Sequence, residues 1–224
     1  MTWRYERPMD DGDHFAVLLD GACEPSARLR HALAGARSIA ADGGMRHAVP
    51  LGLWPELWVG DFDSAEPELR DAYPDVPRDH HPVAKDATDG EIAIRTAMTR
   101  GARRLTIVGA FGGPRIDHAL GTIALTLSLP PELRVAMTDG RQWGYPLHGG
   151  KRIEIGGLPH ATLSIIGFSD LGGLDITGTQ WTLAGASVPF GSSLALSNGI
   201  DANGSATIAL REGRALVVVT PAAD

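Results

Sequence analysis

Cysteine is nearly absent from this chain of 224 residues, which contains only Cys23. A single cysteine cannot form an internal disulfide or a thiolate zinc cluster, and such low usage is typical of a reducing cytoplasm. We expect Cys23 to be a buried or half-buried thiol, although a reactive cysteine remains the alternative. Long apolar runs are also missing, and the charged N-terminus MTWRYERPMDDGDH is not typical of a signal peptide. The sequence therefore predicts a cytoplasmic protein with no membrane partner.

Positive charge is scarce as well. The chain has 20 Lys and Arg against 27 Asp and Glu, so its formal net charge is −7. An acidic chain offers no basic field to nucleic acid, and we expect no nucleic-acid partner. If the substrate carries phosphate, its charge must be neutralised locally by a cation or by a few basic side chains.

Several familiar catalytic motifs are missing too. The chain contains no G-x-x-x-x-G-K-[ST] phosphate loop, no G-x-G-x-x-G fingerprint, no H-E-x-x-H metal motif and no G-x-S-x-G nucleophile elbow. A phosphate-transferring enzyme without a Walker loop would need Mg²⁺ held by carboxylates, together with Arg and Lys side chains.

What is present is an ordinary globular composition with 43% hydrophobic residues, arranged in two different patterns. Up to about residue 139, short apolar runs alternate with segments of helical periodicity, which predicts a parallel sheet covered on both faces. The expected strands are 15–19, 38–41, 57–59, 105–108 and 133–137, and the expected helices are 27–36, 92–98 and 117–129. Ligands of such sheets bind beyond the carboxyl ends of the strands.

After about residue 145, short alternating runs are separated by glycine-rich turns, which is typical of a small β-sandwich. The expected strands are 152–155, 162–166, 180–183, 193–196, 206–210 and 215–220. We therefore predict an α/β fold class: an α/β catalytic domain over residues 1–145, followed by an all-β sandwich domain over 146–224. The linker between them is expected at 145–150.

Acidic residues follow the expected strands or precede the expected helices. Asp42 comes with Gly43 after the second strand, and Asp61 and Asp63 stand in the sequence GDFDS after the third. Residues two apart in an extended segment point to the same side, so Asp61 and Asp63 could face one metal ion. A solvated polar turn is an equally good interpretation of GDFDS alone.

Two further loops each open a helix. In KDATDGE, Thr88 and Glu91 form a predicted capping box, which leaves Lys85, Asp86 and Asp89 available for phosphate or metal. In GGPRIDH, the glycines allow backbone N–H groups to approach a phosphate, and Arg115 adds a planar donor fork. Asp117 and His118 follow directly, although local packing is the commoner role for such a histidine. The sheet rule predicts that most of these loops meet at one edge.

In their order along the chain, these residues resemble the thiamine pyrophosphokinase family. The matching segments are Asp42-Gly43-Gly44, GDFDS, Asp86-x-Thr88-Asp89, Arg115-Ile116-Asp117-His118, Gln180-Trp181-Thr182-Leu183 and Ser197-Asn198. The resemblance runs from about Phe15 to Val219. Pro114 stands where the family usually has a glycine, and Thr122 stands where an Asn is common.

The resemblance implies the transfer of a diphosphoryl group from ATP to the hydroxyl of thiamine, giving thiamine diphosphate and AMP with the help of Mg²⁺. It also implies a homodimer with active sites at the dimer interface. Carried over, the metal ligands are Asp61, Asp63 and Asp89. The polar site around ATP and its phosphates is completed by Asp42, Gly43, Lys85, Asp86, Arg115, Asp117 and His118.

For the thiamine side, the resemblance implies that Trp181 offers an aromatic face to the thiamine rings, with polar contacts from Ser197 and Asn198. A tryptophan at this position could equally belong to the core of the sandwich. Two other functions stay open from the residues: the same chemistry on another acceptor, such as a hydroxymethylpterin, and a protein that binds nucleotide or thiamine without catalysis.

Overall fold

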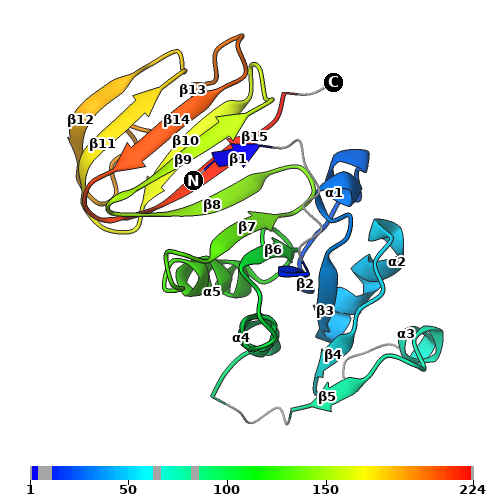
Figure 1. Cartoon of the computed structure of the whole chain (residues 1–224). Coiled ribbons are helices and arrows are strands. Elements are labelled where there is room, and N and C mark those ends of the chain that lie inside the picture. The colour runs from blue at the N-terminus through cyan, green and yellow to red at the C-terminus, as the bar shows by residue number, and fades with distance from the viewer. Residues whose placement is uncertain (1, 5–11, 63–66, 82–85, 223–224) are drawn as a thin grey trace. The chain divides into compact units, whose positions relative to one another are not determined.

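The computed structural model describes residues 2–4, 12–62, 67–81 and 86–222 (Figure 1). The chain divides into two compact units. The α/β unit comprises Pro8–Leu125 and Glu132–Gly140, and the β unit comprises Met1–Arg7, Thr126–Pro131 and Arg141–Asp224. Among the described residues, no helix is long and apolar enough to cross a membrane.

The α/β unit is built on a parallel sheet, as its alternating pattern predicts. In spatial order its strands are β7 (Arg134–Thr138), β6 (Arg104–Val108), β2 (His14–Leu18), β3 (Arg37–Ala41), β4 (Leu57–Gly60) and β5 (Arg78–His80). Every neighbouring pair in this order is parallel. All residues of β2 and β4 are buried, because helices cover both faces of the sheet.

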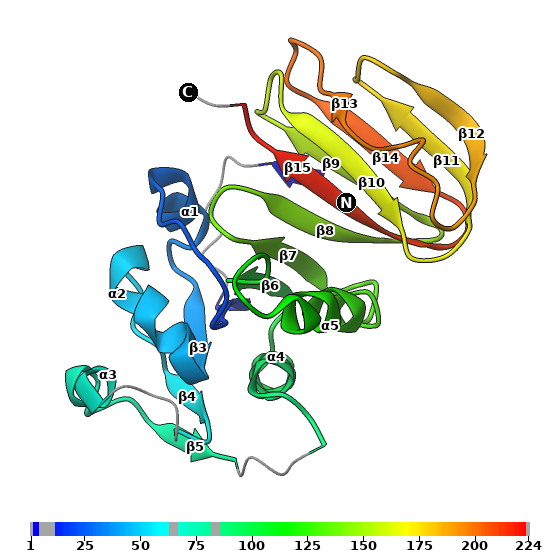
Figure 2. The ribbon, with the colours of Figure 1, turned by 180° about the vertical axis from the view of Figure 1, so that it is seen from behind.

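Helices connect these strands. They are α1 (Ala27–Ala32), the 3₁₀ helix η1 (Asp42–His47), α2 (Ala48–Leu51), α3 (Pro67–Ala72), α4 (Asp89–Thr99) and α5 (Ile116–Thr126). Helices α1, α2 and α3 lie on one side of the sheet, and α4 and α5 lie on the other (Figures 1 and 2). The sides change because the chain first adds strands from β2 toward β5 and then returns to add β6 and β7.

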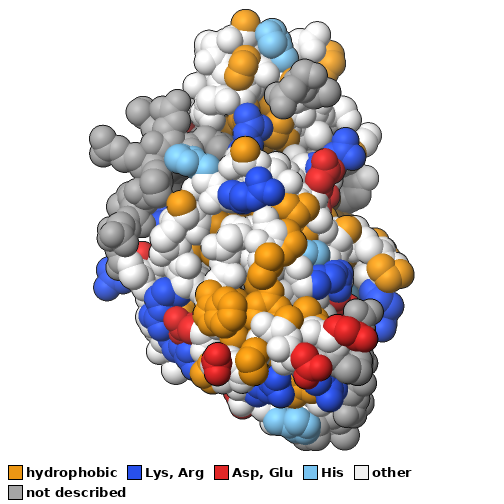
Figure 3. Space-filling model, turned by 90° about the vertical axis from the view of Figure 1, so that its right-hand side faces the viewer, with side chains coloured by type: hydrophobic (Ala, Val, Ile, Leu, Met, Phe, Trp, Pro, Cys, Tyr) orange, Lys and Arg blue, Asp and Glu red, His pale blue; other side chains and the backbone are white. Residues whose placement is uncertain are grey.

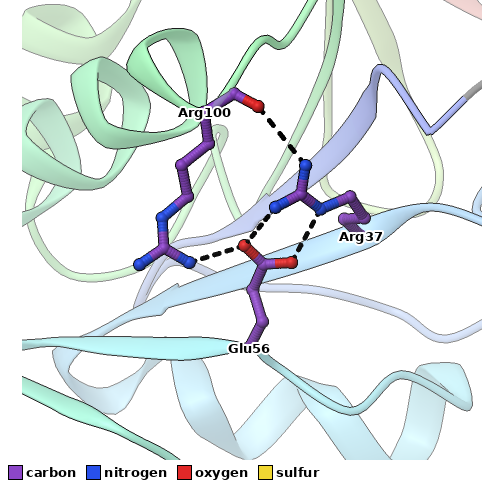
Figure 4. A network of polar contacts seen from close by, with 3 residues as sticks. All are labelled: Arg37, Glu56 and Arg100. Carbon is purple, nitrogen blue, oxygen red and sulfur yellow. Dashed lines mark hydrogen bonds and ion pairs between the residues drawn. The ribbon is translucent and has the colours of Figure 1, made fainter.

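A polar network ties together the amino ends of two strands. Glu56, just before β4, accepts hydrogen bonds of 2.8 Å from Nε and Nη2 of Arg37 at the start of β3, and one of 2.6 Å from Arg100 at the end of α4 (Figure 4). Partial burial would raise the pKa of Glu56, but the hydrogen bonds from the two guanidinium groups outweigh it and lower the pKa below its ordinary value. This network lies at the edge opposite to the carboxyl ends of the strands.

The β unit contains two sheets. One has the strand order β1 (Thr2–Arg4), β9 (Lys151–Gly156), β14 (Ala206–Leu210), β11 (Leu171–Thr177) and β12 (Leu183–Val188). The other runs β13 (Asn198–Gly199), β10 (Thr162–Gly167), β15 (Arg214–Thr220) and β8 (Trp143–His148). Apart from β1, which pairs with β9 in parallel, the strands of this unit pair antiparallel.

Three sequence predictions in this region were wrong. The expected linker at 145–150 begins inside strand β8, whose Trp143, Tyr145 and Leu147 are buried. Pro146 and the following glycine pair looked like a linker, but the alternating apolar residues decide the outcome. Of the expected strands 180–183 and 193–196, only Leu183 lies in a strand, and the Leu196 N–H bonds to the Ser193 carbonyl in a turn.

Large apolar side chains also reach the surface of the α/β unit. Val49 of α2 and Trp54 are 67% and 59% exposed. Figure 3 faces the side on which α2 lies, and it shows hydrophobic side chains gathered among charged ones. The Trp54 ring packs 5.4 Å from the ring of Tyr73, so part of its surface is still covered.

Candidate active site

The sheet of the α/β unit has its topological switch point between β2 and β6. The chain leaves β2 toward β3 on one side, and β6 is added later on the other. Beyond these strands the backbone of Leu19 donates to the carbonyl of Val108 at 2.9 Å. A Cβ at Gly21 would overlap the carbonyl oxygen of Gly109, so the two loops touch through their glycines. Open α/β sheets bind ligands at such a point.

Asp42 stands at the carboxyl end of β3 in an unusual backbone conformation. Its φ is 45°, in the left-handed region that few residues other than glycine adopt. The indole Nε1 of Trp58 donates to the Asp42 carbonyl at 2.8 Å and so holds this backbone. A Cβ at Gly60 would overlap Oδ1 of Asp42. The carboxylate of Asp42 therefore lies directly against the glycine that precedes Asp61.

The GDFDS loop follows β4. Asp61 is half-buried, while Phe62 is buried and has a φ of 60°. The Phe62 ring packs edge-on against Trp58 at 5.2 Å between centroids, which anchors the loop. Asp63 and Ser64 lie outside the described residues. Since Phe62 is left-handed, the alternation of an extended segment does not apply to this loop, and that reason for pairing Asp61 with Asp63 falls away.

Sequence reasoning missed Asp20, which follows β2. Its carboxylate forms an ion pair with Arg46 of η1, and the Arg46 guanidinium also donates to the backbone carbonyls of Asp20, Gly21 and Gly43. A Cβ at Gly43 would overlap the Asp20 carboxylate. The segment Leu18-Leu19-Asp20-Gly21 shows the same signal as the other loops, an acid and a glycine after an apolar strand, and could have been found by it.

The start of α4 joins the same edge of the sheet. Thr88 caps the helix, because its Oγ1 accepts from the Glu91 N–H at 3.2 Å. The Glu91 side chain pairs with Arg95 at 2.7 Å, which fits the normal i,i+4 spacing. A Cβ at Gly90 would come 3.0 Å from Leu19 Cδ2, so the first turn of α4, including Asp89, lies beside the end of β2. Asp86 is exposed, and Lys85 lies outside the described residues.

The start of α5 carries a bidentate ion pair. Arg115 Nε donates to Asp117 Oδ1 at 3.0 Å, and Nη2 donates to Oδ2 at 2.6 Å. These hydrogen bonds from Arg115 lower the pKa of Asp117 to about 2, so its carboxylate is ionised near neutral pH. His118 is exposed. A Cβ at Gly113, just before Arg115, would meet Gly21 and Ala22, so this loop also reaches the end of β2.

The predicted thiamine residues lie in the β unit. Trp181 is 58% exposed and does not belong to the sandwich core. Its backbone N–H donates to Asn198 Oδ1 at 3.1 Å, and its carbonyl accepts from Asn198 Nδ2 at 2.6 Å. Ser197 is exposed, and its φ of 57° is left-handed. Trp181, Ser197 and Asn198 are therefore neighbours. The spacing of their motifs along the sequence could not show this.

Over residues 2–4, 12–62, 67–81 and 86–222, no three His, Cys, Asp or Glu side chains converge as a metal-binding group. Asp63 falls in one of the gaps, so the proposed metal ligands are described only in part. Cys23 is half-buried, and burial raises the pKa of its thiol to about 11, which keeps it protonated near neutral pH. The prediction of a half-buried thiol is confirmed.

Two family models match the chain. The model for "Thiamin pyrophosphokinase, catalytic domain" matches residues 31–137, and that for "Thiamin pyrophosphokinase, vitamin B1 binding domain" matches residues 152–214. A thiamine pyrophosphokinase of Bacillus subtilis (strain 168) is 29% identical over 164 residues, which make up 71% of this chain and 76% of that protein.

Solved structures show the same fold. The crystal structure of thiamine pyrophosphokinase from Bacillus subtilis superposes with a TM-score of 0.80 at 22% identity, covering 94% of this chain and 100% of that one. Thiamin pyrophosphokinase from Candida albicans gives a TM-score of 0.78 at 12% identity, covering 95% and 90%. With both domain models matched in order along the chain, this protein belongs to the thiamine pyrophosphokinase family of enzymes, which use ATP to form thiamine diphosphate.

Proposed function

We propose that the α/β unit transfers a diphosphoryl group from ATP to the hydroxyl of thiamine, with Mg²⁺ held by aspartate carboxylates. The thiamine oxygen attacks the β-phosphorus, the bond from that phosphorus to the α–β bridging oxygen breaks, and AMP leaves. The products are thiamine diphosphate and AMP, and the hydroxyl proton is released. Such a transfer depends on positioning and charge neutralisation rather than on a covalent nucleophile.

One observation carries this proposal: the acid-bearing and glycine-bearing loops meet at the carboxyl edge of one parallel sheet. Asp42 lies against Gly60 and hence beside Asp61, while Gly43 lies against Asp20. The loop before α5 and the first turn of α4 both touch the segment after β2. A protein that binds nucleotide or thiamine without catalysis would not need this many carboxylates beside a phosphate.

The donor set fits Mg²⁺. Carboxylate oxygens are the protein ligands that Mg²⁺ prefers. The carboxylate of Asp42 contacts Gly60, which directly precedes the second acid, Asp61. We assign the metal to Asp61, Asp63 and Asp89. When bound, Mg²⁺ neutralises charge on the phosphate oxygens and lowers the cost of charge developing there.

Basic side chains and helix ends supply the rest of the phosphate site. Arg115 is oriented by its bidentate pair with Asp117 and presents the remaining N–H of its guanidinium to phosphate oxygens. Lys85 and His118 flank the same phosphates, with Asp86 and Gly43 completing the site. The backbone N–H groups in the first turn of α4 add a favourable dipole for anions, and Thr88 fixes where that turn begins.

Thiamine binds to the β unit in this proposal. The exposed ring of Trp181 offers a flat apolar face with a negative quadrupole, which attracts a cationic thiazolium by about 1 kcal/mol at a partly exposed site. Ser197 supplies a hydroxyl for a polar contact. A cytoplasmic location belongs to the same proposal.

We also propose that the enzyme is a homodimer with active sites at the dimer interface. Ile116 and Leu120 of α5 are 70% and 53% exposed, and large apolar side chains on one helix are a feature of surfaces that a partner covers. Sedimentation equilibrium decides this point: a mass of twice 23.7 kDa is expected, and a monomer at micromolar concentration would contradict it.

The function is tested by product analysis. The protein is incubated with ATP, Mg²⁺ and thiamine, and AMP and ADP are separated by chromatography. AMP formed in step with thiamine diphosphate is the expected result; ADP, or unchanged nucleotide, would refute the proposal. A parallel reaction with a hydroxymethylpterin tests the acceptor, and AMP formed faster with the pterin would assign the enzyme to a different substrate. Asp61→Asn is expected to abolish turnover while the protein stays folded.

A further inference from the structure

Both polar atoms of the Asn198 side chain bond to the backbone of another residue. It is 5% exposed, its Oδ1 accepts from the Trp181 N–H, and its Nδ2 donates to the Trp181 carbonyl. The amide thus bonds Trp181 as a neighbouring strand would, with one acceptor and one donor. Because Asn198 is this deeply buried, it has almost no accessible surface with which to contact a ligand.

The segment before Trp181 is fixed in the same way. Thr179 is 4% exposed, and its Oγ1 donates to the Trp181 carbonyl at 3.0 Å. Thr179 also bridges to Ile200, and the Gln180 N–H donates to the Gly199 carbonyl at 2.8 Å. Residues 179–181 are therefore held along 198–200 by backbone and side-chain bonds together. Trp181 itself is 58% exposed, so these bonds fix its backbone while much of the residue stays open to solvent.

We propose that Asn198 is a positioning residue that holds Trp181 in place for thiamine and makes no contact with thiamine itself. This inference rests on the proposed function, and it changes the role that the family resemblance implied for Asn198. We call the hydrogen bonds of Asn198 and Thr179 to the Trp181 backbone the clamp. An aromatic ring that is fixed before thiamine binds loses less conformational freedom on association, so the clamp raises the affinity for thiamine without adding a contact. Ser197 differs: its backbone N–H donates to Ser164 Oγ at 3.0 Å, and its exposed hydroxyl is left for the ligand.

A double-mutant cycle tests this role. Asn198→Ala removes two hydrogen bonds from the clamp, and we expect the KM for thiamine to rise on the order of tenfold while the KM for ATP is unchanged. In the Trp181→Ala background the same change should have no further effect, because Asn198 acts through Trp181. Independent, multiplicative effects of the two substitutions would show direct contact and overturn the proposal. Asn203→Ala is the matched control, since the Asn203 side chain accepts only from the nearby Ser205 N–H on the surface.

A second pair of variants tests the same role in case Asn198→Ala does not fold. Thr179→Val removes one bond to the Trp181 carbonyl and is expected to raise the KM for thiamine, whereas Thr179→Ser keeps the hydroxyl and the wild-type value. Equal constants for the two variants would overturn the proposal. In protein labelled with 5-fluorotryptophan, the ¹⁹F resonance of Trp181, assigned by its loss in Trp181→Phe, should broaden or split in Thr179→Val and stay sharp in Thr179→Ser.

Failure of the inference and failure of the proposed function give different results. If wild-type protein forms no AMP with thiamine, the proposed function itself is wrong. If AMP forms and Trp181→Ala leaves the KM for thiamine unchanged, the aromatic platform is wrong, and the clamp has nothing to position. If AMP forms and Trp181→Ala weakens thiamine binding, the cycle decides the role of Asn198 alone.

Discussion

At the scale of single residues, backbone strain gathers in the predicted site loops. Within the described part of the chain, the non-glycine residues with left-handed φ are Asp42, Phe62, His160 and Ser197. Three of these four stand in segments that sequence reasoning assigned to chemistry or to thiamine. A left-handed non-glycine residue costs on the order of 1 kcal/mol or more, and such residues cluster at active sites where surrounding structure holds them.

The strained, glycine-contacting position of Asp42 therefore predicts that a change there lowers activity and leaves stability unchanged. Asp42→Asn keeps the side-chain size and tolerates a left-handed φ, but it removes the charge beside Gly60. We expect kcat to fall on the order of a hundredfold, comparable to loss of one electrostatic group in other active sites, with no loss in the free energy of unfolding. Steady-state AMP formation and urea denaturation measure the two quantities.

The control is Asp71→Asn, because Asp71 is an exposed acid of α3 that no observation links to the site loops. Its turnover should equal that of the wild type. If Asp42→Asn retains wild-type turnover, Asp42 has no place in the phosphate site.

The burial of His14 predicts that the free energy of unfolding depends on pH. Its Nε2 lies 2.9 Å from Thr106 Oγ1 inside the sheet, and burial, followed by the nearby Arg104, lowers the pKa of His14 to about 3. The unfolded chain binds a proton below about pH 6.5, whereas the folded protein does not, so the free energy of unfolding should fall as pH drops from 6.5 toward 3.

Urea denaturation between pH 7.5 and 4 tests this dependence. The difference in stability between wild type and His14→Gln should shrink or reverse as pH falls, because glutamine takes up no proton. A difference that stays constant over this range would contradict the assignment of a neutral, buried His14.

At the scale of elements, glycines determine how closely the site loops approach. Gly21, Gly43, Gly60 and Gly109 all occupy positions where a Cβ would overlap atoms of a neighbouring loop. The sequence pattern of glycine beside acid after a strand already indicated tight loops. It could not indicate which loop each glycine faces, because that depends on the strand order.

Gly60→Ala tests this packing directly. The added methyl would occupy the place of the Asp42 carboxylate oxygen, so Asp42 must move. We expect turnover to fall at least tenfold, since displacements near 1 Å in an active site have large effects on rate. The measurement is kcat/KM for ATP at saturating thiamine.

Gly121→Ala is the matched control, because a Cβ at Gly121 in α5 has nothing within 4 Å. This change should keep wild-type activity and stabilise the protein slightly, as alanine is the better helix former. Equal activity for Gly60→Ala and wild type would show that the Asp42 position does not matter for turnover.

Element boundaries show what sequence patterns can and cannot predict. Strands β2, β3, β4, β6 and β7 fall within a residue or two of their predicted positions, because continuous apolar runs are a strong signal of buried parallel strands. Strand β5 was missed, since Arg78-Asp79-His80 is polar and lies at the end of the strand order. The helix expected at 27–36 ends at Ala32, because the N–H groups of Ala34 and Ala36 bond only three residues back and the chain turns.

At the scale of the whole molecule, the order of motifs proved more informative than any single motif. The change from helical to alternating patterns correctly indicated an α/β part and a smaller antiparallel β part. The sequence could not show that Asn198 bonds both backbone groups of Trp181, because contacts 17 residues apart depend on how the β strands pair. Nor could it show the ion pair of Asp20 with Arg46, which depends on the packing of η1 beside β2.

The most direct test of the central claim follows the phosphorus atoms of ATP. In separate reactions with thiamine and Mg²⁺, ATP is labelled at the α or the γ phosphorus, and the products are separated. Diphosphoryl transfer predicts that the γ label appears in thiamine diphosphate and the α label in AMP. Label from the γ position in thiamine monophosphate, together with ADP formation, would mean that a single phosphoryl group is transferred, and it would contradict the account.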